Sequence, residues 1–293
     1  MGMSRLFEIS HLRCSYDRPF KEGLSKVVLE IRHLVLPRGK KIFIVGESGI
    51  GKSTILEVLG MMNNTIVPDK SSQFFFYDDE GISYDLIDMW AGGSDKVLSD
   101  FRLRHFNFIF QNTNLMPNFT AYENIAITRM LQGYSREEAF GKTSAVLKDI
   151  GLGFLDTDRI SNELSGGQQQ RLAFARAILP DFSVLFGDEP TGNLDPENAM
   201  AAMELLSRKL STLKGSSAII VSHDMHLATS FADIVIKVRK ESSKERDSHN
   251  EVVSYGVVDD MSVFRPDEDR SSWNNGEDCY STEGFELLLR KKN

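Results

Sequence analysis

Nine consecutive residues form a pattern that cradles phosphate in many nucleotide-using proteins. The sequence Gly46-Glu47-Ser48-Gly49-Ile50-Gly51-Lys52-Ser53-Thr54 fits the spacing G-x-x-x-x-G-K-[ST]. In such a loop backbone N–H groups converge on an anion at a helix N-terminus, whose partial positive charge favours phosphate. Lys52 is expected to reach the β- and γ-phosphates, and the Ser53 hydroxyl to ligate Mg²⁺. The alternative, a glycine turn that merely begins a helix, is disfavoured by the buried strand expected before it.

A second motif far along the chain narrows the class. Leu164-Ser165-Gly166-Gly167-Gln168 is followed by Gln169-Gln170-Arg171. Ser165 and Gln168 have the spacing of a capping box, which predicts that a helix begins here. The helix N-terminus and its glycines form an anion site that is open to a phosphate from elsewhere. Taken together, the two motifs resemble those of the ATP-binding cassette (ABC) ATPases, and the resemblance covers roughly residues 6 to 238.

The resemblance implies roles for residues that follow expected buried strands. Asp188 and Glu189 end the strand that begins at Val184, and ligands of α/β proteins bind at the carboxyl ends of such strands. In the family, the first carboxylate holds Mg²⁺, directly or through water, and the second is the general base for the attacking water. His223 matches the switch histidine that contacts the γ-phosphate. As isolated residues, the acidic pair would be solvated surface charges and the histidine structural.

Four further residues take their expected roles from the same resemblance. Gln111 matches the glutamine that touches Mg²⁺ and the attacking water, and Thr54 supports the α-phosphate. Asp195 closes a segment that resembles the D-loop, which couples two sites across a dimer. Tyr16 resembles the aromatic residue that stacks on adenine, although it has the alternative of packing on any apolar surface.

The patterning around these motifs predicts an α/β fold. Strands with one exposed face are expected at residues 6–9 and 27–36, and buried strands at 42–45, 184–186 and 218–221. Helices are expected at 52–60, 136–150, 168–179 and 197–213. Residues 74–77 and 82–87 resemble strands of an expanded sheet lobe within a longer segment, 62–100, whose simplest interpretation is a surface insertion. Alternating strands and helices indicate a parallel sheet core. The resemblance implies a P-loop NTPase cassette with a RecA-like core, an antiparallel β lobe and a helical signature subdomain.

Composition sets limits on the class of protein. Of the 293 residues, 41% are hydrophobic and 26% charged, which is ordinary for a globular chain. The net charge of −8 argues against general binding to nucleic acid, which needs clustered Lys and Arg. Cys14 and Cys279 offer no disulfide framework and fit a reducing compartment. The chain lacks a secretory signal and an apolar stretch of transmembrane length, so we expect a soluble, cytosolic protein.

A finer resemblance concerns partners. Residues 114–125, NLMPNFTAYENI, are similar to a segment of the LolD/MacB/FtsE group of ABC ATPases, as are GQQQR and DEPTGNLD. The group implies a subunit that powers lipoprotein release or macrolide or peptide export, docked through residues 110–125 on a permease at the cytoplasmic face of a bacterial inner membrane. Each chain has one phosphate loop and one signature, so the family's arrangement requires a C2 homodimer around two ATP molecules.

The sequence leaves alternative functions open and some regions of the chain unexplained. The alternative functions are an FtsE-like mechanotransmission ATPase and a soluble non-transport ABC ATPase. The soluble ATPase is disfavoured, because a second cassette or a long coiled coil does not fit in this chain. We expect the cassette at residues 1–238, with its helical subdomain at about 101–180. Residues 239–293 form a C-terminal extension, with a polar loop at 240–250 and a tail that is an acidic appendage, a small strand-bearing lobe or disordered.

Overall fold

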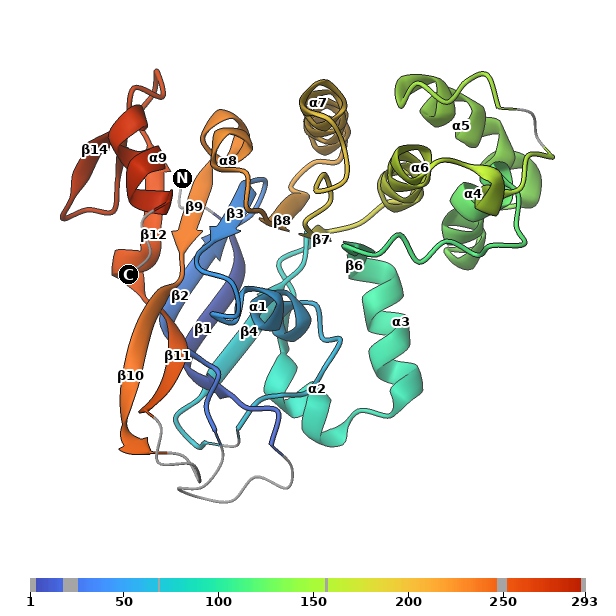
Figure 1. Cartoon of the computed structure of the whole chain (residues 1–293). Coiled ribbons are helices and arrows are strands. Elements are labelled where there is room, and N and C mark those ends of the chain that lie inside the picture. The colour runs from blue at the N-terminus through green and yellow to red at the C-terminus, as the bar shows by residue number, and fades with distance from the viewer. Residues whose placement is uncertain (1–3, 18–25, 68, 156–157, 247–251, 291–293) are drawn as a thin grey trace. The chain divides into compact units, whose positions relative to one another are not determined.

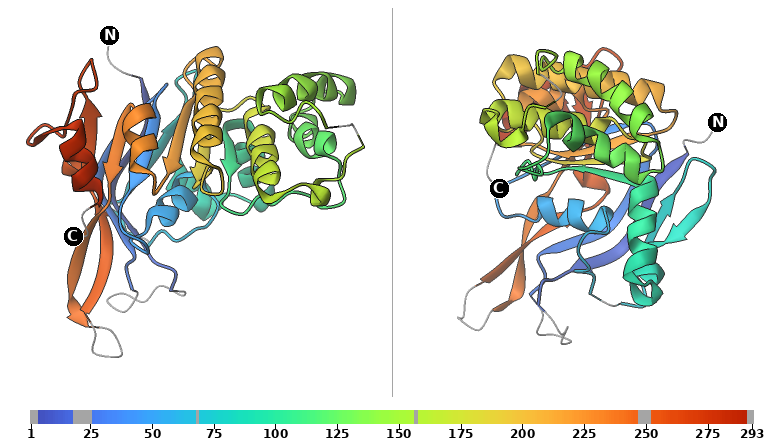
Figure 2. Two further views of the ribbon diagram at one scale, coloured as in Figure 1. Left: turned by 45° about the horizontal axis from the view of Figure 1, so that its top comes forward. Right: turned by 90° about the vertical axis from the view of Figure 1, so that its right-hand side faces the viewer.

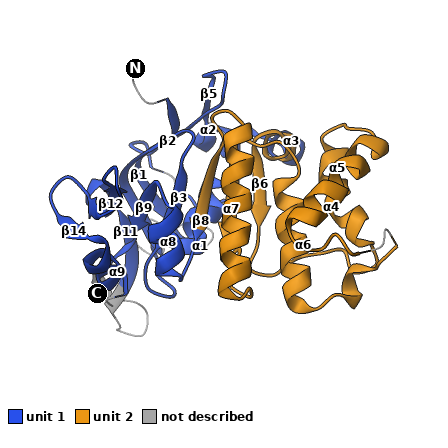
Figure 3. Cartoon of the chain, turned by 90° about the horizontal axis from the view of Figure 1, so that it is seen from above, with its two compact units in different colours: residues 1–98, 221–293 blue, residues 99–220 orange. Residues whose placement is uncertain are grey.

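The computed structural model describes residues 4–17, 26–67, 69–155, 158–246 and 252–290 (Figure 1). The chain forms two compact units (Figure 3). Unit 1 comprises residues 1–98 and 221–293, and unit 2 comprises residues 99–220. Helix α3 (Asp95–His105) and strand β8 (Ser217–Val221) contain the points where the chain passes from one unit to the other.

Unit 1 contains a six-stranded, mainly antiparallel sheet. Its strands, in spatial order, are β10 (Arg239–Arg246), β11 (Val252–Val258), β2 (Leu29–Pro37), β1 (Arg5–Cys14), β4 (Gln73–Tyr77) and β5 (Ser83–Asp85). The antiparallel pairing of β1 and β2 sets the buried Ile9 opposite the buried Leu34. The rings of Phe7 and Phe76 pack with centroids 5.3 Å apart on the buried face. This sheet is the expected antiparallel β lobe.

A second group of strands in unit 1 carries the phosphate loop. In spatial order it comprises β14 (Cys279–Ser281), β13 (Ser272–Asn274), β12 (Val263–Pro266), β9 (Ile234–Lys237) and β3 (Lys41–Val45). β3 and β9 are parallel, with Phe43 opposite Val235, and both strands are almost wholly buried. The helices of unit 1 are α1 (Lys52–Leu59), α2 (Leu86–Gly92), α8 (Met225–Phe231) and α9 (Thr282–Arg290). The expected buried strand before the phosphate loop is therefore confirmed.

Unit 2 combines the remaining parallel strands with the longer helices. β6 (Phe106–Ile109) and β7 (Val184–Asp188) are parallel, and β8 neighbours β7. The Phe186 ring packs edge-on against Phe106 and is stacked with Phe108, with centroids 5.3 Å apart in both pairs. The helices are α4 (Ala121–Leu131), α5 (Arg136–Asp149), α6 (Gly166–Ile178) and α7 (Pro196–Thr212). Among the residues described, no helix combines the length and apolar character needed to cross a bilayer.

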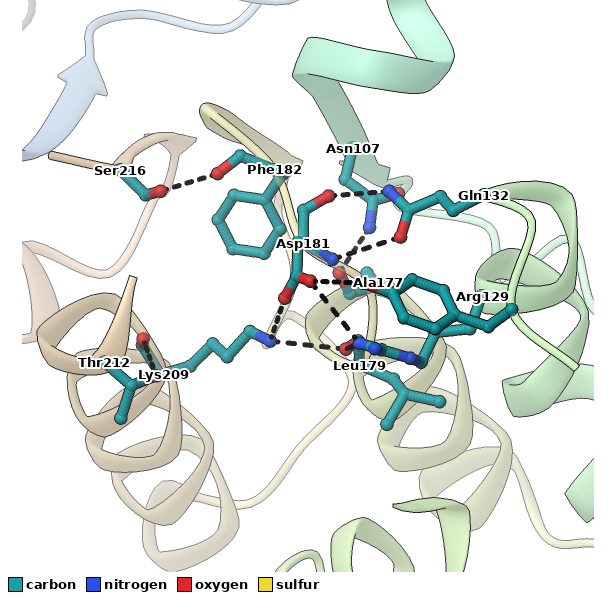
Figure 4. A network of polar contacts seen from close by, with 11 residues as sticks. Asn107, Arg129, Gln132, Ala177, Leu179, Asp181, Phe182, Lys209, Thr212 and Ser216 are labelled. Atoms are coloured by element: carbon teal, nitrogen blue, oxygen red, sulfur yellow. Dashed lines mark hydrogen bonds and ion pairs between the residues drawn. The ribbon is translucent and has the colours of Figure 1, made fainter. Parts of the chain in front are cut away.

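A polar network joins three helices of unit 2 around the loop that leads into β7 (Figure 4). Asp181 receives ion pairs from Arg129 of α4 (3.7 Å) and Lys209 of α7 (3.4 Å). Both cations also donate hydrogen bonds to the Leu179 carbonyl at the end of α6. Burial lowers the pKa of Lys209. The network fixes the end of the signature helix to the helices on either side.

One expectation for local structure is wrong. Residues 82–87 were expected to form a strand, but β5 ends at Asp85 because its side chain caps α2 by accepting from the N–H groups of Ile87 and Asp88. Residues 101–180, the expected helical subdomain, are mostly helical but also contain strand β6, which pairs with β7. A four-residue apolar run next to a helical pattern does not distinguish a strand from a helix.

The C-terminal region also departs from expectation. A polar loop was expected at 240–250, but β10 continues to Arg246, and residues 247–251 lie outside the described part. Pairing with β11 and a two-pronged ion pair from Arg32 to Glu241 (3.0 and 2.6 Å) stabilise this polar strand. Of the three possibilities for the tail, residues 259–290 form a strand-bearing lobe, in which Trp273 stacks on Phe285 with centroids 4.9 Å apart. The apolar residues of this segment are too widely spaced to show a periodicity in sequence.

Candidate functional site

The phosphate loop has a backbone shape that its glycines permit. Gly46, Gly49 and Gly51 have φ values of 155°, 76° and 98°, which lie in a region that other residues rarely adopt. A Cβ atom at Gly51 would also lie 3.2 Å from the Val28 carbonyl oxygen. The dihedral angles therefore favour glycine at all three positions, and close packing adds to this at Gly46 and Gly51.

Lys52 lies over the phosphate loop. Its side chain is buried, and its ammonium donates hydrogen bonds to the carbonyl oxygens of Gly46 (3.0 Å) and Glu47 (2.7 Å). Ser53 and Thr54 follow in the first turn of α1, with Ser53 exposed and Thr54 buried. The loop thus holds a cation and a hydroxyl next to a helix N-terminus, which is the chemistry of an anion site.

The N-termini of α1 and α6 differ from those of all other described α-helices. No described side chain caps α1, which begins after Gly51, and α6 is capped by the neutral Ser165. Neither helix has an acidic residue in its first turn. Every other α-helix of the described chain has Asp or Glu at its N-cap or in its first turn. Carboxylates there stabilise a helix, so their absence leaves two positive helix ends for another anion.

The C-terminal hairpin of β10 and β11 supports the phosphate loop. A Cβ atom on Gly256 of β11 would overlap the Ile50 carbonyl oxygen, so only glycine fits beside the loop. Lys240 of β10 lies 3.9 Å from the Glu47 carboxylate. The sequence analysis missed both residues. The signal that points to Gly256 is an isolated glycine inside a strand pattern, which often marks a close approach of another backbone.

Tyr16 and His223 also lie in unit 1. The Tyr16 hydroxyl lies 3.1 Å from Thr54 Oγ1 and donates to the Glu57 carboxylate at 2.8 Å. Tyr16 is 49% exposed beside α1, and its partial burial raises the pKa of its hydroxyl. His223 is exposed and lies immediately before α8. Its neighbours are anchored: the Ser222 N–H donates to the Ile44 carbonyl of β3, and Asp224 is the N-cap of α8. The structure therefore places Tyr16 beside the phosphate-loop helix, and His223 after strand β8.

The signature residues begin helix α6 in unit 2. Ser165 and Gln168 form the expected capping box: the Ser165 hydroxyl accepts from the Gln168 N–H at 3.4 Å, and the Gln168 side chain accepts from the Ser165 N–H at 2.9 Å. A Cβ atom at Gly166 or Gly167 would meet nothing within 4 Å in the described structure. Packing within the chain therefore does not explain why glycine occupies the first turn of this helix.

The acidic residues of unit 2 lie at the end of β7 and in the loop that follows. Asp188 is the last residue of β7 and is partly buried, as is Glu189. Glu189 has a φ of 50°, a left-handed conformation that costs a non-glycine residue about 1–3 kcal/mol and that is concentrated at functional sites. Gln170 of α6 donates to the Pro190 carbonyl at 3.0 Å, which ties the signature helix to this loop. Strand, strained residue and signature helix thus form one connected group.

Asp195 has a structural role in the same region. It is the N-cap of α7 and accepts from the Asn198 N–H at 2.9 Å, and this hydrogen bond lowers its pKa. Asp195 is therefore a helix cap as well as a member of the expected D-loop.

Gln111 is exposed at the start of the segment between β6 and α4. The following residues are held firmly: Arg176 of α6 donates to the carbonyls of Thr113 (2.7 Å) and Asn114 (2.8 Å). The Asn124 side chain bonds both the N–H and the carbonyl of Met116. This segment is thus anchored to the helix that carries the signature motif.

Comparisons with known proteins give a consistent picture. The family model described as "ABC transporter" matches residues 29–192. The chain is 35% identical over 222 residues to the lipoprotein-releasing system ATP-binding protein LolD of Syntrophotalea carbinolica, covering 74% of this chain and 90% of that protein. It is 36% identical over 223 residues to the macrolide export ATP-binding/permease protein MacB of Shewanella sp. (strain ANA-3), covering 76% of this chain and 31% of that protein.

A solved structure gives the same result at the level of the fold. The dimeric structure of MJ0796, a bacterial ABC transporter cassette, superposes with a TM-score of 0.66 at 28% identity. The match covers 79% of this chain and 94% of that one. A second dimeric structure of that cassette, in a post-hydrolysis state with bound ADP and Pi, matches with a TM-score of 0.64.

Proposed function

The chain belongs to the ABC transporter family and is an ATP-binding, ATP-hydrolysing subunit. From this premise we propose the role of each site residue in ATP binding and hydrolysis. In unit 1 the phosphate loop and Lys52 hold the β- and γ-phosphates, and Tyr16 stacks on adenine. In unit 2 Glu189 is the general base, and Gln111 contributes to positioning the attacking water. His223 of unit 1 contacts the γ-phosphate.

One observation carries this assignment: α1 begins without a cap or a carboxylate, beside a buried lysine. A negative charge stabilises a helix N-terminus, and the Lys52 ammonium, which donates to the loop carbonyls, adds positive charge to the same loop. Phosphoryl transfer requires the phosphates to be held and their charge neutralised, and these groups do both. ATP is therefore the ligand that completes the loop.

The oxygen donors of the proposed metal site suit Mg²⁺, which prefers hydroxyl, carboxylate and amide oxygens. Ser53 is exposed in the first turn of α1, Asp188 ends β7, and Gln111 is exposed after β6. No cluster of His, Cys, Asp and Glu that suits a metal occurs in the described part of the chain. Ser53, Asp188 and Gln111 would hold the Mg²⁺, which would neutralise part of the phosphate charge.

Glu189 is the residue on which hydrolysis depends. Its left-handed backbone holds the carboxylate directly after the strand end, where a water can be oriented and deprotonated. Glu189→Gln keeps the shape of the side chain but removes the base, so ATP turnover should fall by about 100-fold or more while ATP binding is retained. Lys52→Ala should instead weaken ATP binding itself.

Steady-state ATPase assays and nucleotide titrations of the purified chain separate these two results. Glu197→Gln, in the exposed first turn of α7, is the matched control and should turn over like the wild type. Equal turnover in Glu189→Gln and the wild type would show that Glu189 is not the base.

We assign the signature of each chain to the nucleotide of a second copy. Glycine at positions 166 and 167 weakens the first turn of α6 by roughly 0.5–1 kcal/mol per residue relative to alanine, without a packing reason in the described chain. Bare backbone at a helix N-terminus is suited to the close approach of a phosphate. The positive end of α6 would thus bind the γ-phosphate held by the partner's phosphate loop, which makes a C2 homodimer around two ATP molecules.

The proposed permease-docking surface is the segment 110–125. Phe119 is 38% exposed, and Leu115 and Met116 are partly exposed beside it, while Asn124 and Arg176 fix the backbone. A rigid, partly apolar segment that continues from Gln111 is able to transmit a change at the nucleotide to a docked helix. The complex would lie on the cytoplasmic face of the membrane. We propose that it exports or extracts an amphipathic molecule, a choice guided by the names of the LolD and MacB relatives.

The docking surface is tested with a purified complex of the chain and its permease. Phe119→Ala should reduce permease-dependent stimulation of ATP hydrolysis several-fold and leave the basal rate of the isolated chain nearly unchanged. Leu131→Ala, another exposed apolar residue of unit 2, is the control. Full stimulation of the Phe119→Ala complex would contradict the docking assignment.

A further inference from the structure

The C-terminal lobe binds the helix that follows the proposed switch histidine. In Figure 1 and in the left view of Figure 2, the red C-terminal segment lies beside the orange helix α8, and α8 and α9 are in contact. Helix α8 has seven residues and begins at Met225, two positions after His223. Isolated helices of this length are not stable in water, so the position of α8 depends on what it packs against.

Arg270 holds the C-terminal end of α8. Its guanidinium donates to the carbonyl oxygens of Thr229 (3.2 Å) and Ala232 (2.8 Å). These carbonyls are at the negative end of the helix, and α8 has no basic residue in its own last turn. Arg270 therefore supplies, from the C-terminal lobe, the cation that this helix lacks.

Arg270 also connects α8 to the strand that leads into the phosphate loop. Its guanidinium lies 3.7 Å from the Asp233 carboxylate. Asp233 accepts from the Lys41 N–H at 2.8 Å and donates its own N–H to the Lys41 carbonyl at 2.8 Å, at the start of β3. Arg270 adopts a φ of 59°, a conformation in which glycine would be less strained. Arginine is thus present at position 270 although the backbone conformation there favours glycine.

Glu286 of α9 holds the middle of α8. Its carboxylate accepts from the buried Thr229 hydroxyl at 2.7 Å. The Met225 and His226 carbonyls lie farther from the same hydroxyl, at 3.1 and 3.2 Å, and one hydroxyl proton serves one acceptor well. Thr282, the first residue of α9, in turn donates to the Arg270 carbonyl at 2.6 Å. Both contacts with α8 thus belong to one connected lobe.

We infer that Arg270 and Glu286 are positioning residues for ATP hydrolysis, which hold α8 and through it set the orientation of the His223 ring. The chain is anchored on both sides of His223: before it, the Ser222 N–H donates to the Ile44 carbonyl of β3, and after it, Asp224 caps α8 by accepting from the Leu227 N–H. The lobe fixes the other end of the short helix. This inference rests on the proposed role of His223 at the γ-phosphate.

The test is a double-mutant cycle in the full chain, read by steady-state ATP hydrolysis. Arg270→Gly removes the guanidinium and relieves the left-handed backbone, so the fold is retained. We expect kcat to fall about 5- to 10-fold with KM for ATP within about 2-fold, because Arg270 is linked through Asp233 to the start of β3 and not to the phosphate loop itself. In a His223→Ala background, Arg270→Gly should cause no further loss, because it acts through the histidine. An equal fractional loss in both backgrounds would overturn the inference.

Matched variants exclude a general loss of stability. Arg265→Ala removes an exposed arginine of the same lobe, and Glu283→Ala an exposed glutamate of the same helix; both should keep the wild-type kcat. Glu286→Ala should lower kcat, and Glu286→Gln, which keeps an acceptor oxygen, should restore most of it. A kcat for Glu286→Gln as low as that for Glu286→Ala would contradict the positioning role of this hydrogen bond.

NMR of ¹³C-labelled histidine separates the failure of this inference from the failure of the proposed function. The His223 signal, assigned by its loss in His223→Ala, should shift in Arg270→Gly and not in Arg265→Ala. If His223→Ala turns over like the wild type, the proposed role of His223 is wrong, and the inference falls with it. If His223→Ala is impaired but Arg270→Gly changes neither the signal nor kcat, the role of His223 stands and the lobe does not position it.

Discussion

The N-termini of α1 and α6 are alike in charge and different in construction. Both begin without an acidic residue, unlike the other described α-helices. The first turn of α1 follows a tightly shaped glycine loop, with a buried lysine and with Gly256 of a distant strand packed against it. The first turn of α6 is closed by its own capping box and contains Gly166 and Gly167, where an added Cβ would meet nothing within 4 Å in the described structure.

This difference indicates two kinds of anion site. The site at α1 is complete within the chain, because the lysine and the loop shape are already in place. The site at α6 provides only a helix end and bare backbone, so it needs a ligand that something else holds. We therefore expect changes at α1 to affect ATP binding by a single chain, and changes at α6 to affect only the assembled dimer.

The largest effect should come from placing a carboxylate at the N-terminus of α1. In Ser53→Asp, ATP affinity should fall by about 100-fold or more, because like charges about 4 Å apart repel by roughly 4 kcal/mol near a protein surface. Without nucleotide the same variant should melt slightly higher than the wild type, since a carboxylate in the first turn stabilises a helix. Calorimetric titration and thermal melts measure the two effects, which have opposite signs.

Ser53→Asn is the neutral control for this prediction. It should lose less affinity than Ser53→Asp and should not raise the melting temperature. If Ser53→Asp bound ATP as well as Ser53→Asn does, the helix end would not be the phosphate site.

A smaller effect on the same site is expected from Gly256→Ala. The added methyl group overlaps the Ile50 carbonyl, so the loop or strand β11 must shift, and ATP affinity should fall about 10-fold. Gly92→Ala, at the end of α2 where a Cβ meets nothing within 4 Å, is the matched control and should bind ATP normally. Unchanged ATP affinity in Gly256→Ala would mean that the hairpin does not shape the loop.

The smallest effect concerns the cap of α7. Asp195→Ala should lower the melting temperature by a few degrees at pH 7, because the N–H of Asn198 loses its acceptor. The pKa of Asp195 is depressed in the folded chain, so its contribution is present above the unfolded pKa of about 3.9 and is lost as pH falls through the lower folded pKa. The difference in melting temperature should therefore shrink in acid, and a constant difference across pH would contradict this cause.

Local sequence predicted the elements whose signals are themselves local. The buried strand before Gly46, the helix at Lys52 and the capping box at Ser165 were all confirmed, because periodicity and cap spacing determine them. The extent of β10 and the order of the C-terminal lobe were not predicted, because they depend on pairing with β11 and on the Trp273–Phe285 stack. Contacts between residues so far apart in sequence have no periodic signature.

Prediction of the functional site from sequence has the same limit. The motif residues were identified by their type and spacing. The residues that hold them in place were not identified: Gly256 packs against the phosphate loop, Arg176 bonds the segment after Gln111, and Arg270 bonds the end of α8. Each support acts through a backbone carbonyl of another segment. A side chain that bonds a backbone group places no constraint on the residue type of its partner, so sequence patterns do not reveal Arg176 or Arg270, whereas Gly256 has the signal of an isolated glycine inside a strand pattern.

The central claim is that the N-terminus of α6 binds the phosphate of an ATP molecule held by a second copy of the chain. Light scattering in the Glu189→Gln background tests this claim. With ATP this variant should be a dimer, and without ATP mostly a monomer, because two chains of net charge −8 otherwise repel. Adding Gly166→Asp should leave ATP affinity unchanged but give monomers, whereas adding the same charge at Gly141, on an exposed part of α5, should leave the dimer intact. Dimers of the Gly166→Asp variant with the same ATP dependence would contradict the account.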